Sequence, residues 1–163
     1  MLGRLAVGFA AAMATMSIYC DGSAHPRPGL AGGWAYVIVL GDEAVCMGSG
    51  GDRCTTNNVM EMTAALRGLQ EAVSKGWHRE HALELVSDSR VTLEVASGGP
   101  LPARHVELWR ELRAVFAESG AVTRWVRGHS GDRWNETVDA KAFEEMRVLV
   151  PAKARRRQEA RKP

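Results

Sequence analysis

The apolar positions of the chain follow a strand-like pattern in its first third and a helix-like pattern afterwards. Residues 17–20, 33–40 and 43–48 are short runs typical of β-strands, and Gly41-Asp42 between the last two is a tight hairpin signal. Consecutive strands joined this closely must be antiparallel. The pattern therefore predicts three antiparallel strands at the start of the folded domain.

Helical stripes and short strands alternate in the rest of the chain. A helix is predicted to begin at Asn57-Asn58, where Asn58 is a good N-cap and Glu61 completes a capping box, and to end near Lys75-Gly76. The same signals then predict a strand over 82–86, a short helix after Asp88, a helix over 105–118, a strand over 122–126 and a helix over 134–146. This order indicates an α/β fold with a mixed five-stranded sheet and helices packed on both faces.

Length and composition indicate one globular domain, which we place at residues 17–148. The chain has 163 residues, 45% of them hydrophobic and 25% charged, so it can bury a real core. Residues 1–16 are interpreted as an extension. Arg4 and the apolar run over 5–14 resemble a short signal peptide, but a misplaced start codon or a disordered extension explains them better. The run is too short to span a bilayer, so no membrane association is expected.

The charges are unevenly distributed. Six of the 21 Lys and Arg residues and one of the 19 Asp and Glu residues fall within the last thirteen positions, so the chain ends in a basic tail, placed at 149–163. The preceding part then holds 15 basic and 18 acidic residues. A basic tail on a mildly acidic body indicates an anionic partner for the tail and cations for the body. The alternative is that the tail is a solvated, disordered end.

Four carboxylates occupy positions suited to chemistry. Asp21 ends the first predicted strand and Asp88 the fourth, and parallel neighbours would bring both to the carboxyl end of the sheet, where open α/β sheets bind ligands. Glu61 and Asp139 lie on helices. Four carboxylates that met there would repel one another without cations, and Mg²⁺ is a natural counterpart. The alternatives are that Glu61 and Asp88 cap helices and that Asp139 is a solvated helix residue.

Five short motifs resemble, in order, those of type 1 ribonuclease H. They are Ile18-Tyr19-Cys20-Asp21-Gly22-Ser23, Thr55-Thr56-Asn57-Asn58-Val59-Met60-Glu61, Val86-Ser87-Asp88-Ser89, Trp125-Val126-Arg127-Gly128-His129-Ser130-Gly131 and Asn135-Glu136-x-x-Asp139. The resemblance runs from about Ser17 to Met146. A single motif of this kind is weak, but five in order on the expected elements are highly specific. The resemblance implies a ribonuclease H-like fold.

The resemblance also implies an activity and its catalytic residues. A ribonuclease H is an endonuclease that hydrolyses the RNA strand of RNA–DNA hybrids by a two-metal mechanism and leaves 5′-phosphate and 3′-hydroxyl ends. Asp21, Glu61, Asp88 and Asp139 match the metal-binding carboxylates, with two Mg²⁺ ions expected and Mn²⁺ as a substitute. His129 matches a histidine that assists proton transfer or product release, and an imidazole side chain suits either role.

Other residues match positions that contact the hybrid. Thr56, Asn57 and Asn58 correspond to the family's hybrid-reading run, and Asn amides suit base edges and 2′-hydroxyls in a minor groove. Trp109 matches an aromatic position and is expected to line a channel for the DNA strand, with an inward core position as the alternative. Trp125, on a predicted strand, is expected to belong to the core.

The chain departs from the family pattern in its basic surface. Longer bacterial members carry a basic helix and loop where this chain has only residues 95–104. Because binding of a polyanion depends on basic contacts, we expect the tail to compensate for this absent handle. The loop over 24–29 lacks the family's usual Asn, with Arg27 as a replacement, and Arg90 stands where many members have a polar amide.

Two rival functions remain on the sequence alone. One is a non-catalytic nucleic-acid-binding module of the same fold, which the presence of all four carboxylates disfavours. The other is a nuclease of the same fold with another substrate, which the Thr56-Asn57-Asn58 run disfavours. Three cysteines without Cys-x-x-Cys spacing indicate reduced thiols in the cytoplasm. We expect a monomer.

Overall fold

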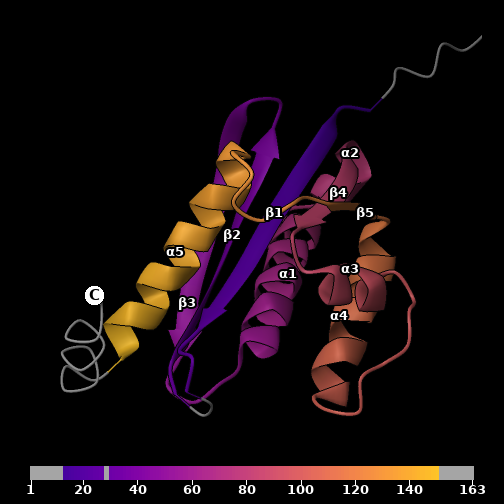
Figure 1. Cartoon of the computed structure of the whole chain (residues 1–163). Helices are drawn as coiled ribbons and strands as arrows, with labels where there is room; N and C mark the ends of the chain where they lie inside the picture. Colours follow the sequence, from indigo (N-terminus) through magenta and orange to yellow (C-terminus); the bar gives the residue numbers. More distant parts are fainter. Residues whose placement is uncertain (1–12, 28–29, 151–163) are drawn as a thin grey trace, which may run out of the picture.

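The structure, a computed structural model, describes residues 13–27 and 30–150 and contains one mixed sheet flanked by helices (Figure 1). The elements are, in chain order, β1 (Thr15–Ala24), β2 (Gly32–Leu40), β3 (Glu43–Asp52), α1 (Asn57–Ser74), α2 (Trp77–Glu80), β4 (Ala82–Ser87), α3 (Arg90–Ala96), α4 (Val106–Ser119), β5 (Val122–Trp125) and α5 (Arg133–Leu149). The strand order is β3-β2-β1-β4-β5. β1, β2 and β3 are antiparallel, whereas β4 and β5 run parallel to β1. The predicted α/β fold with a mixed five-stranded sheet is confirmed.

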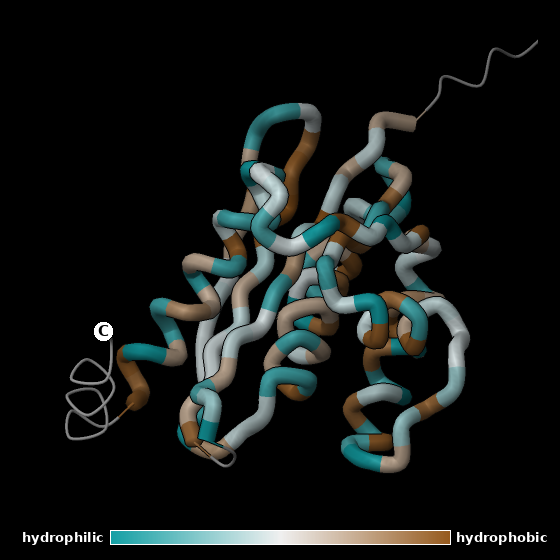
Figure 2. Tube along the Cα trace, viewed as in Figure 1, coloured by the Kyte–Doolittle hydropathy of each residue, from teal (hydrophilic) through white to brown (hydrophobic). Residues whose placement is uncertain are grey.

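Each face of the sheet has its own core because strand side chains alternate. Ile18 and Cys20 of β1 pack in a cluster that includes residues of α1, α3 and α4. Tyr19 packs in a second cluster with Val138 and Ala142 of α5. The helices therefore divide between the faces, with α5 alone on one side (Figure 1). Apolar and polar positions alternate along α5 in Figure 2, as expected for a helix with one face on the sheet.

The ends of several elements differ from the prediction. β1 begins at Thr15, two residues before the predicted strand, and it continues to Ala24, so Asp21 lies within the strand and not at its end. β3 also continues past its predicted end, to Asp52, because it stays paired with β2. The four-residue helix α2 was not predicted, since its few residues show no periodicity.

The start of α1 is capped by a different residue than the sequence indicates. Thr56 is the N-cap, and its hydroxyl accepts a hydrogen bond from the Val59 amide at 3.4 Å. Asn58 lies inside the helix, and Glu61 falls beyond the first turn, so the predicted capping box is wrong. Glu61 is thereby free for contacts across the molecule.

Two further predictions concern the ends of the chain and the membrane. The expectations for residues 1–12 and for the basic stretch over 151–163 fall outside the described residues. Within residues 13–27 and 30–150, no helix is long and apolar enough to cross a membrane. All three cysteines, Cys20, Cys46 and Cys54, are free thiols.

Candidate active site

Asp21 and Asp88 are brought together by the register of the parallel strands. β1 and β4 pair so that Tyr19 lies opposite Val86. Asp21 and Asp88 each follow two residues later, so both side chains leave the same face beyond the last paired residues. Asp21 is 6% exposed and Asp88 is half-buried. The register, together with the effect of the Asp88 charge on Asp21, supports the predicted proximity of these two carboxylates, although Asp21 lies inside β1 and Asp88 just beyond the end of β4.

Glu61 reaches the same place because α1 packs directly against β1. A Cβ atom on Gly22 would lie 2.2 Å from the Glu61 backbone nitrogen, so only a glycine permits this approach. The Glu61 carboxylate accepts hydrogen bonds from Asn57 Nδ2 and from Ser89 Oγ, each at 2.6 Å. These bonds hold Glu61 between the start of α1 and the loop that follows Asp88.

Asp139 and His129 form the outer part of the site. Asp139 lies on α5, and the His129 Nδ1 atom is 3.7 Å from the Asp139 Oδ2 atom. The His129 side chain is 83% exposed and its backbone has a φ of 52°, a left-handed conformation that is uncommon for a residue with a side chain. The loop before α5 therefore presents the imidazole to solvent beside a carboxylate.

The electrostatics of the site are those of crowded, unneutralised carboxylates. Burial, followed by the neighbouring charge of Asp88, raises the pKa of Asp21 to about 8, and Asp139 and Glu61 add to this rise. Burial also raises the pKa of Glu61. Among the described residues, Asp21, Glu61 and Asp88 form no ion pair with a Lys or Arg side chain. No positively charged side chain in the part that the structure describes therefore neutralises these three carboxylates, and a bound cation would stabilise their charged forms.

The donor set fits hard divalent cations. Carboxylate oxygens are the ligands that Mg²⁺ prefers, and the raised pKa of Asp21 marks a charge that a bound cation would relieve. As the side chains stand, no three His, Cys, Asp or Glu residues in the described part of the chain are grouped closely enough to hold a metal. Cation binding would therefore draw these side chains together.

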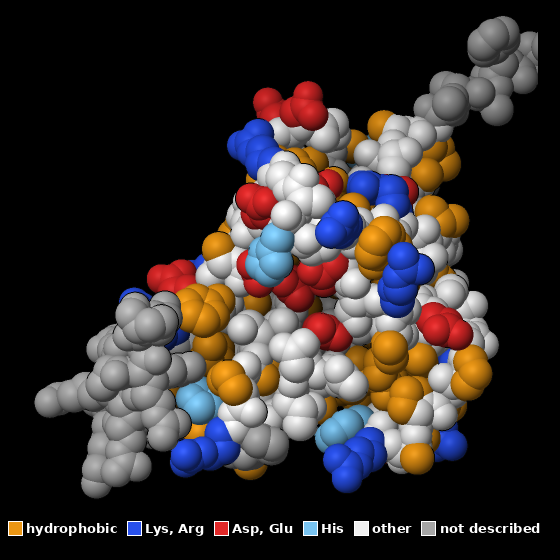
Figure 3. Space-filling model, viewed as in Figure 1, with side chains coloured by type: hydrophobic (Ala, Val, Ile, Leu, Met, Phe, Trp, Pro, Cys, Tyr) orange, Lys and Arg blue, Asp and Glu red, His pale blue; other side chains and the backbone are white. Residues whose placement is uncertain are grey.

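Viewed from this side, acidic side chains gather near the middle of the molecular face, with a histidine beside them (Figure 3). Lys and Arg side chains lie above and to the right of this acidic centre in the same view. A centre of negative charge beside positive side chains suits a polyanionic ligand whose reacting group must come close to cations.

A groove borders the site on the α1 side. A cavity of about 320 Å³ is lined by Thr56, Asn57, Asn58, Met62, Pro102, Arg104, His105 and Trp109. The three residues predicted to contact the hybrid therefore share one groove. Thr56, Asn57 and Asn58 are exposed there. Asn57 also donates to Glu61, so one residue joins the groove to the carboxylates.

The two tryptophans differ in burial. Trp109 is 2% exposed and packs in the core, which was the alternative expected for it, and it also lies in the wall of the groove. Its contact with a nucleic-acid strand stays a prediction. Trp125 is 43% exposed, so its expected core position is wrong. β5 is an edge strand of the sheet, which leaves part of the Trp125 side chain exposed.

Some functional contacts were missed by sequence reasoning. Ser89 caps α3 and also donates to Glu61, and only its place beside Asp88 could have suggested this. Trp125 Nε1 donates to the Asp88 backbone carbonyl at 3.0 Å. A Cβ atom on Gly128 would lie 2.6 Å from Asp88 Oδ2, so this glycine lets the loop pass close to the carboxylate. These contacts depend on tertiary approach, which local sequence does not reveal.

The mixed sheet, with Asp21 and Asp88 on neighbouring parallel strands and Glu61 and Asp139 on the helices packed against it, has the arrangement that the fold prediction expected. The family model for RNase H matches residues 13–147. A ribonuclease H from Marinobacter nauticus is 37% identical over 145 residues, which cover 81% of this chain and 94% of that protein. The chain belongs to the ribonuclease H family.

Solved structures show the same fold. LC11-RNase H1, isolated from compost, has a TM-score of 0.73 and 21% identity, with 85% of this chain and 100% of that chain covered. The structure of LC11-RNase H1 in complex with an RNA/DNA hybrid has a TM-score of 0.64 and 22% identity, with 79% of this chain and 97% of that chain covered. At these identities the likeness concerns the fold.

Proposed function

We propose that this protein is an endonuclease that hydrolyses the RNA strand of RNA–DNA hybrids, with Mg²⁺ held by Asp21, Glu61, Asp88 and Asp139. The observation that carries the proposal is the position of the buried Asp21 carboxylate, whose pKa of about 8 is raised by burial and by the other three carboxylates. Family membership supplies the reaction class. The hybrid bound to LC11-RNase H1 supports the substrate.

The reaction breaks the bond between phosphorus and the 3′-oxygen of the RNA. A water oxygen attacks the phosphorus in line, the 3′-oxygen leaves and takes a proton, and the products carry 5′-phosphate and 3′-hydroxyl ends. Two bound Mg²⁺ ions, for which Mn²⁺ is a substitute, would supply the charge that activates the water and stabilises the leaving oxygen. Asp21, Glu61, Asp88 and Asp139 are the residues that would hold these ions.

His129 handles protons or product at the edge of this site. Its Nδ1 atom is turned toward Asp139, and the ring is exposed enough to exchange protons with solvent. A histidine in contact with a carboxylate and with water suits proton transfer to the leaving group or displacement of the product.

The groove formed by Thr56, Asn57 and Asn58 reads the hybrid. Exposed amides and a hydroxyl beside the carboxylates are suited to base edges and 2′-hydroxyls in a minor groove, and the 2′-hydroxyl distinguishes RNA from DNA. Because Asn57 also bonds Glu61, a correctly seated hybrid would steady a catalytic carboxylate. We propose that the protein acts as a monomer in the cytoplasm, where its free thiols stay reduced.

The test is cleavage of an end-labelled RNA–DNA hybrid in Mg²⁺ beside duplex DNA and duplex RNA of the same sequence. The proposal requires cleavage of the RNA strand in the hybrid alone, with Asp21→Asn inactive. Hybrid binding without cleavage in Mg²⁺ or Mn²⁺ would instead favour a binding module of the same fold. Equal cleavage of duplex DNA would favour a nuclease with another substrate.

A further inference from the structure

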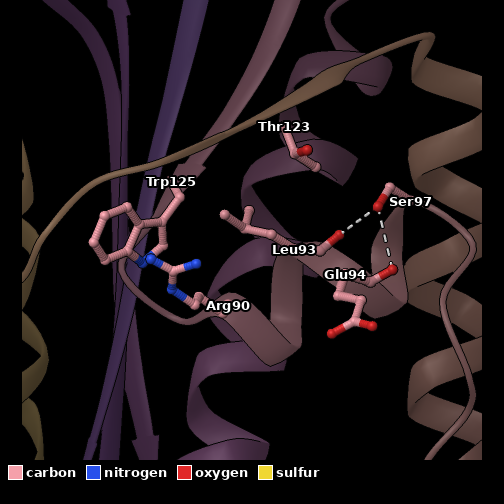
Figure 4. A pocket seen from close by; sticks show the side chains of 6 residues that line it. All are labelled: Arg90, Leu93, Glu94, Ser97, Thr123 and Trp125. Atoms are coloured by element: carbon pink, nitrogen blue, oxygen red, sulfur yellow. Dashed lines mark hydrogen bonds between the residues drawn. The ribbon is translucent and has the colours of Figure 1, made fainter.

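A second cavity lies between α3, which follows Asp88, and the edge strand β5, which flanks β4 on the side away from β1. Its volume is about 430 Å³, and it is lined by Arg90, Leu93, Glu94, Ser97, Thr123 and Trp125 (Figure 4). Arg90 and Glu94 belong to α3, and Trp125 belongs to the edge strand β5. The cavity thus begins two residues beyond a catalytic carboxylate.

Arg90 is held in this cavity by an aromatic ring. Its guanidinium carbon lies 4.0 Å from the centroid of the Trp125 ring, a distance typical of a cation–π contact. Trp125 is in turn fixed to the Asp88 backbone by its indole hydrogen bond. The positive charge of Arg90 is therefore tied to the position of Asp88 through one rigid side chain.

Arg90 keeps its charge available for a ligand. Glu94 is four residues further along α3, at a spacing that allows an ion pair, yet the Arg90 side chain points to Trp125 and away from Glu94 (Figure 4). Among the described residues, Arg90 makes no ion pair with any carboxylate. Arg90 is exposed, so its planar donors face solvent at the mouth of the cavity.

We propose that Arg90, held against Trp125, binds a backbone phosphate of the RNA strand that neighbours the scissile phosphate. The inference rests on the proposed function, since the reacting phosphate must lie at the cations that Asp88 would help to hold for its neighbour to reach Arg90. A stacked guanidinium is suited to bidentate contact with phosphate oxygens. The groove formed by Thr56, Asn57 and Asn58 and the Arg90 contact would then bind the hybrid at two places. The RNA strand would be held over the carboxylates between them.

The test compares Arg90→Gln with Arg79→Gln in steady-state cleavage of a hybrid in Mg²⁺ over a series of KCl concentrations. Arg79 is an exposed arginine in α2, before the start of β4, and so lies at the opposite end of that strand from Asp88. We expect Arg90→Gln to raise KM about tenfold at low salt with kcat changed less than about twofold, and to flatten the salt dependence by about one phosphate contact. Arg79→Gln should match the wild type.

The phosphate itself is located with hybrids that carry one neutral methylphosphonate at a time in the RNA strand, each next to a 2′-O-methyl nucleotide. Each is compared with a hybrid that has the same 2′-O-methyl nucleotide and an ordinary phosphate, so that loss of a 2′-hydroxyl contact is separated from loss of the phosphate charge. The wild type should lose kcat/KM at one position beside the cleavage site, and Arg90→Gln should show no further loss at that position. In a Trp125→Leu background, Arg90→Gln should have a smaller effect, because the ring that holds the guanidinium is absent. Circular dichroism verifies that these variants fold.

The outcomes separate this inference from the proposed function. A wild type that cleaves the hybrid while Arg90→Gln and Arg79→Gln give the same KM and salt dependence overturns the Arg90 contact alone. If Arg90→Gln lowers kcat/KM by the same factor at every methylphosphonate position, the Arg90 contact is also overturned. The variant would then act by lowering the overall positive charge and not by losing a contact with one phosphate. A wild type that does not cleave the hybrid overturns both proposals.

Discussion

The site has a buried half and an exposed half, and the two are built differently. Asp21 is 6% exposed within β1, and the strand register fixes it beside Asp88. Asp139 and His129 lie on a helix and a loop, with side chains 39% and 83% exposed. The buried half keeps carboxylates where they repel one another, whereas the exposed half can exchange protons and product with water. We therefore expect the sheet residues to provide the negative charge that binds cations, and the outer loop to affect proton exchange and product release.

The largest effect is expected from neutralising the buried half. Asp21→Asn preserves shape but removes the charge that would hold cations, so kcat in Mg²⁺ should fall at least about thousandfold. The measurement is single-turnover cleavage of the hybrid. Asp42→Asn, an exposed change in the β2–β3 hairpin, is the matched control and should leave the rate unchanged. Residual activity above a few per cent in Asp21→Asn would remove this carboxylate from the mechanism.

The exposed half should tolerate change better. His129→Asn keeps a residue that accepts the left-handed backbone but removes the imidazole, so kcat should fall about ten- to a hundredfold while KM for the hybrid stays near the wild-type value. Added imidazole should restore part of the rate, because it replaces the missing side chain. A loss as deep as that of Asp21→Asn would contradict the division into two halves.

Without metal, the buried half should destabilise the protein as the pH rises. The folded-state pKa of Asp21, about 8, lies above its ordinary value of 3.8, so the folded state binds a proton more tightly between these values. The free energy of unfolding in EDTA should therefore decrease as the pH increases from about 4 to about 8. Asp21→Asn has no carboxyl group to ionise at this position. It should therefore be more stable than the wild type at pH 8.5, by at least about 2 kcal/mol.

Denaturant unfolding at pH 5 and pH 8.5 measures this difference, which should shrink at pH 5. Mg²⁺ should raise the stability of the wild type at pH 8.5 more than that of Asp21→Asn, because only the wild type holds the full set of carboxylates. Equal stability of both proteins at both pH values would contradict the buried, unneutralised state of Asp21.

The smallest effect concerns the two tryptophans that flank these halves. Trp125→Phe should reduce the fraction of fluorescence that acrylamide quenches, since the ring is 43% exposed, with little change in stability. Trp109→Phe removes a buried fluorophore, so it should raise the quenchable fraction, and it should lower stability by about 1–3 kcal/mol, because it opens space in the core. A quenchable fraction that falls in Trp109→Phe and not in Trp125→Phe would contradict these placements.

The sequence predicted the sheet and the order of its elements apart from α2, because these depend on local periodicity. The four carboxylates were named from motifs carried by single elements, and their role stays a prediction. The sequence did not predict that Trp125 is exposed. Trp109 and Trp125 each have one apolar and one Arg neighbour. Their exposure is decided by the packing of α4 and by the edge position of β5. The cap of α1 was misplaced because Thr56 and Asn58 are both good capping residues.

The central claim is that the carboxylate site hydrolyses RNA with divalent cations, and the chemistry of the product ends tests it most directly. A hybrid with labelled RNA is cleaved in Mg²⁺ and in EDTA, and the new ends are identified by enzymatic treatment and mass. The account predicts 5′-phosphate and 3′-hydroxyl ends that form only with Mg²⁺ or Mn²⁺ and vanish in Asp21→Asn. Products with 2′,3′-cyclic phosphate ends, or cleavage that persists in EDTA, would contradict it.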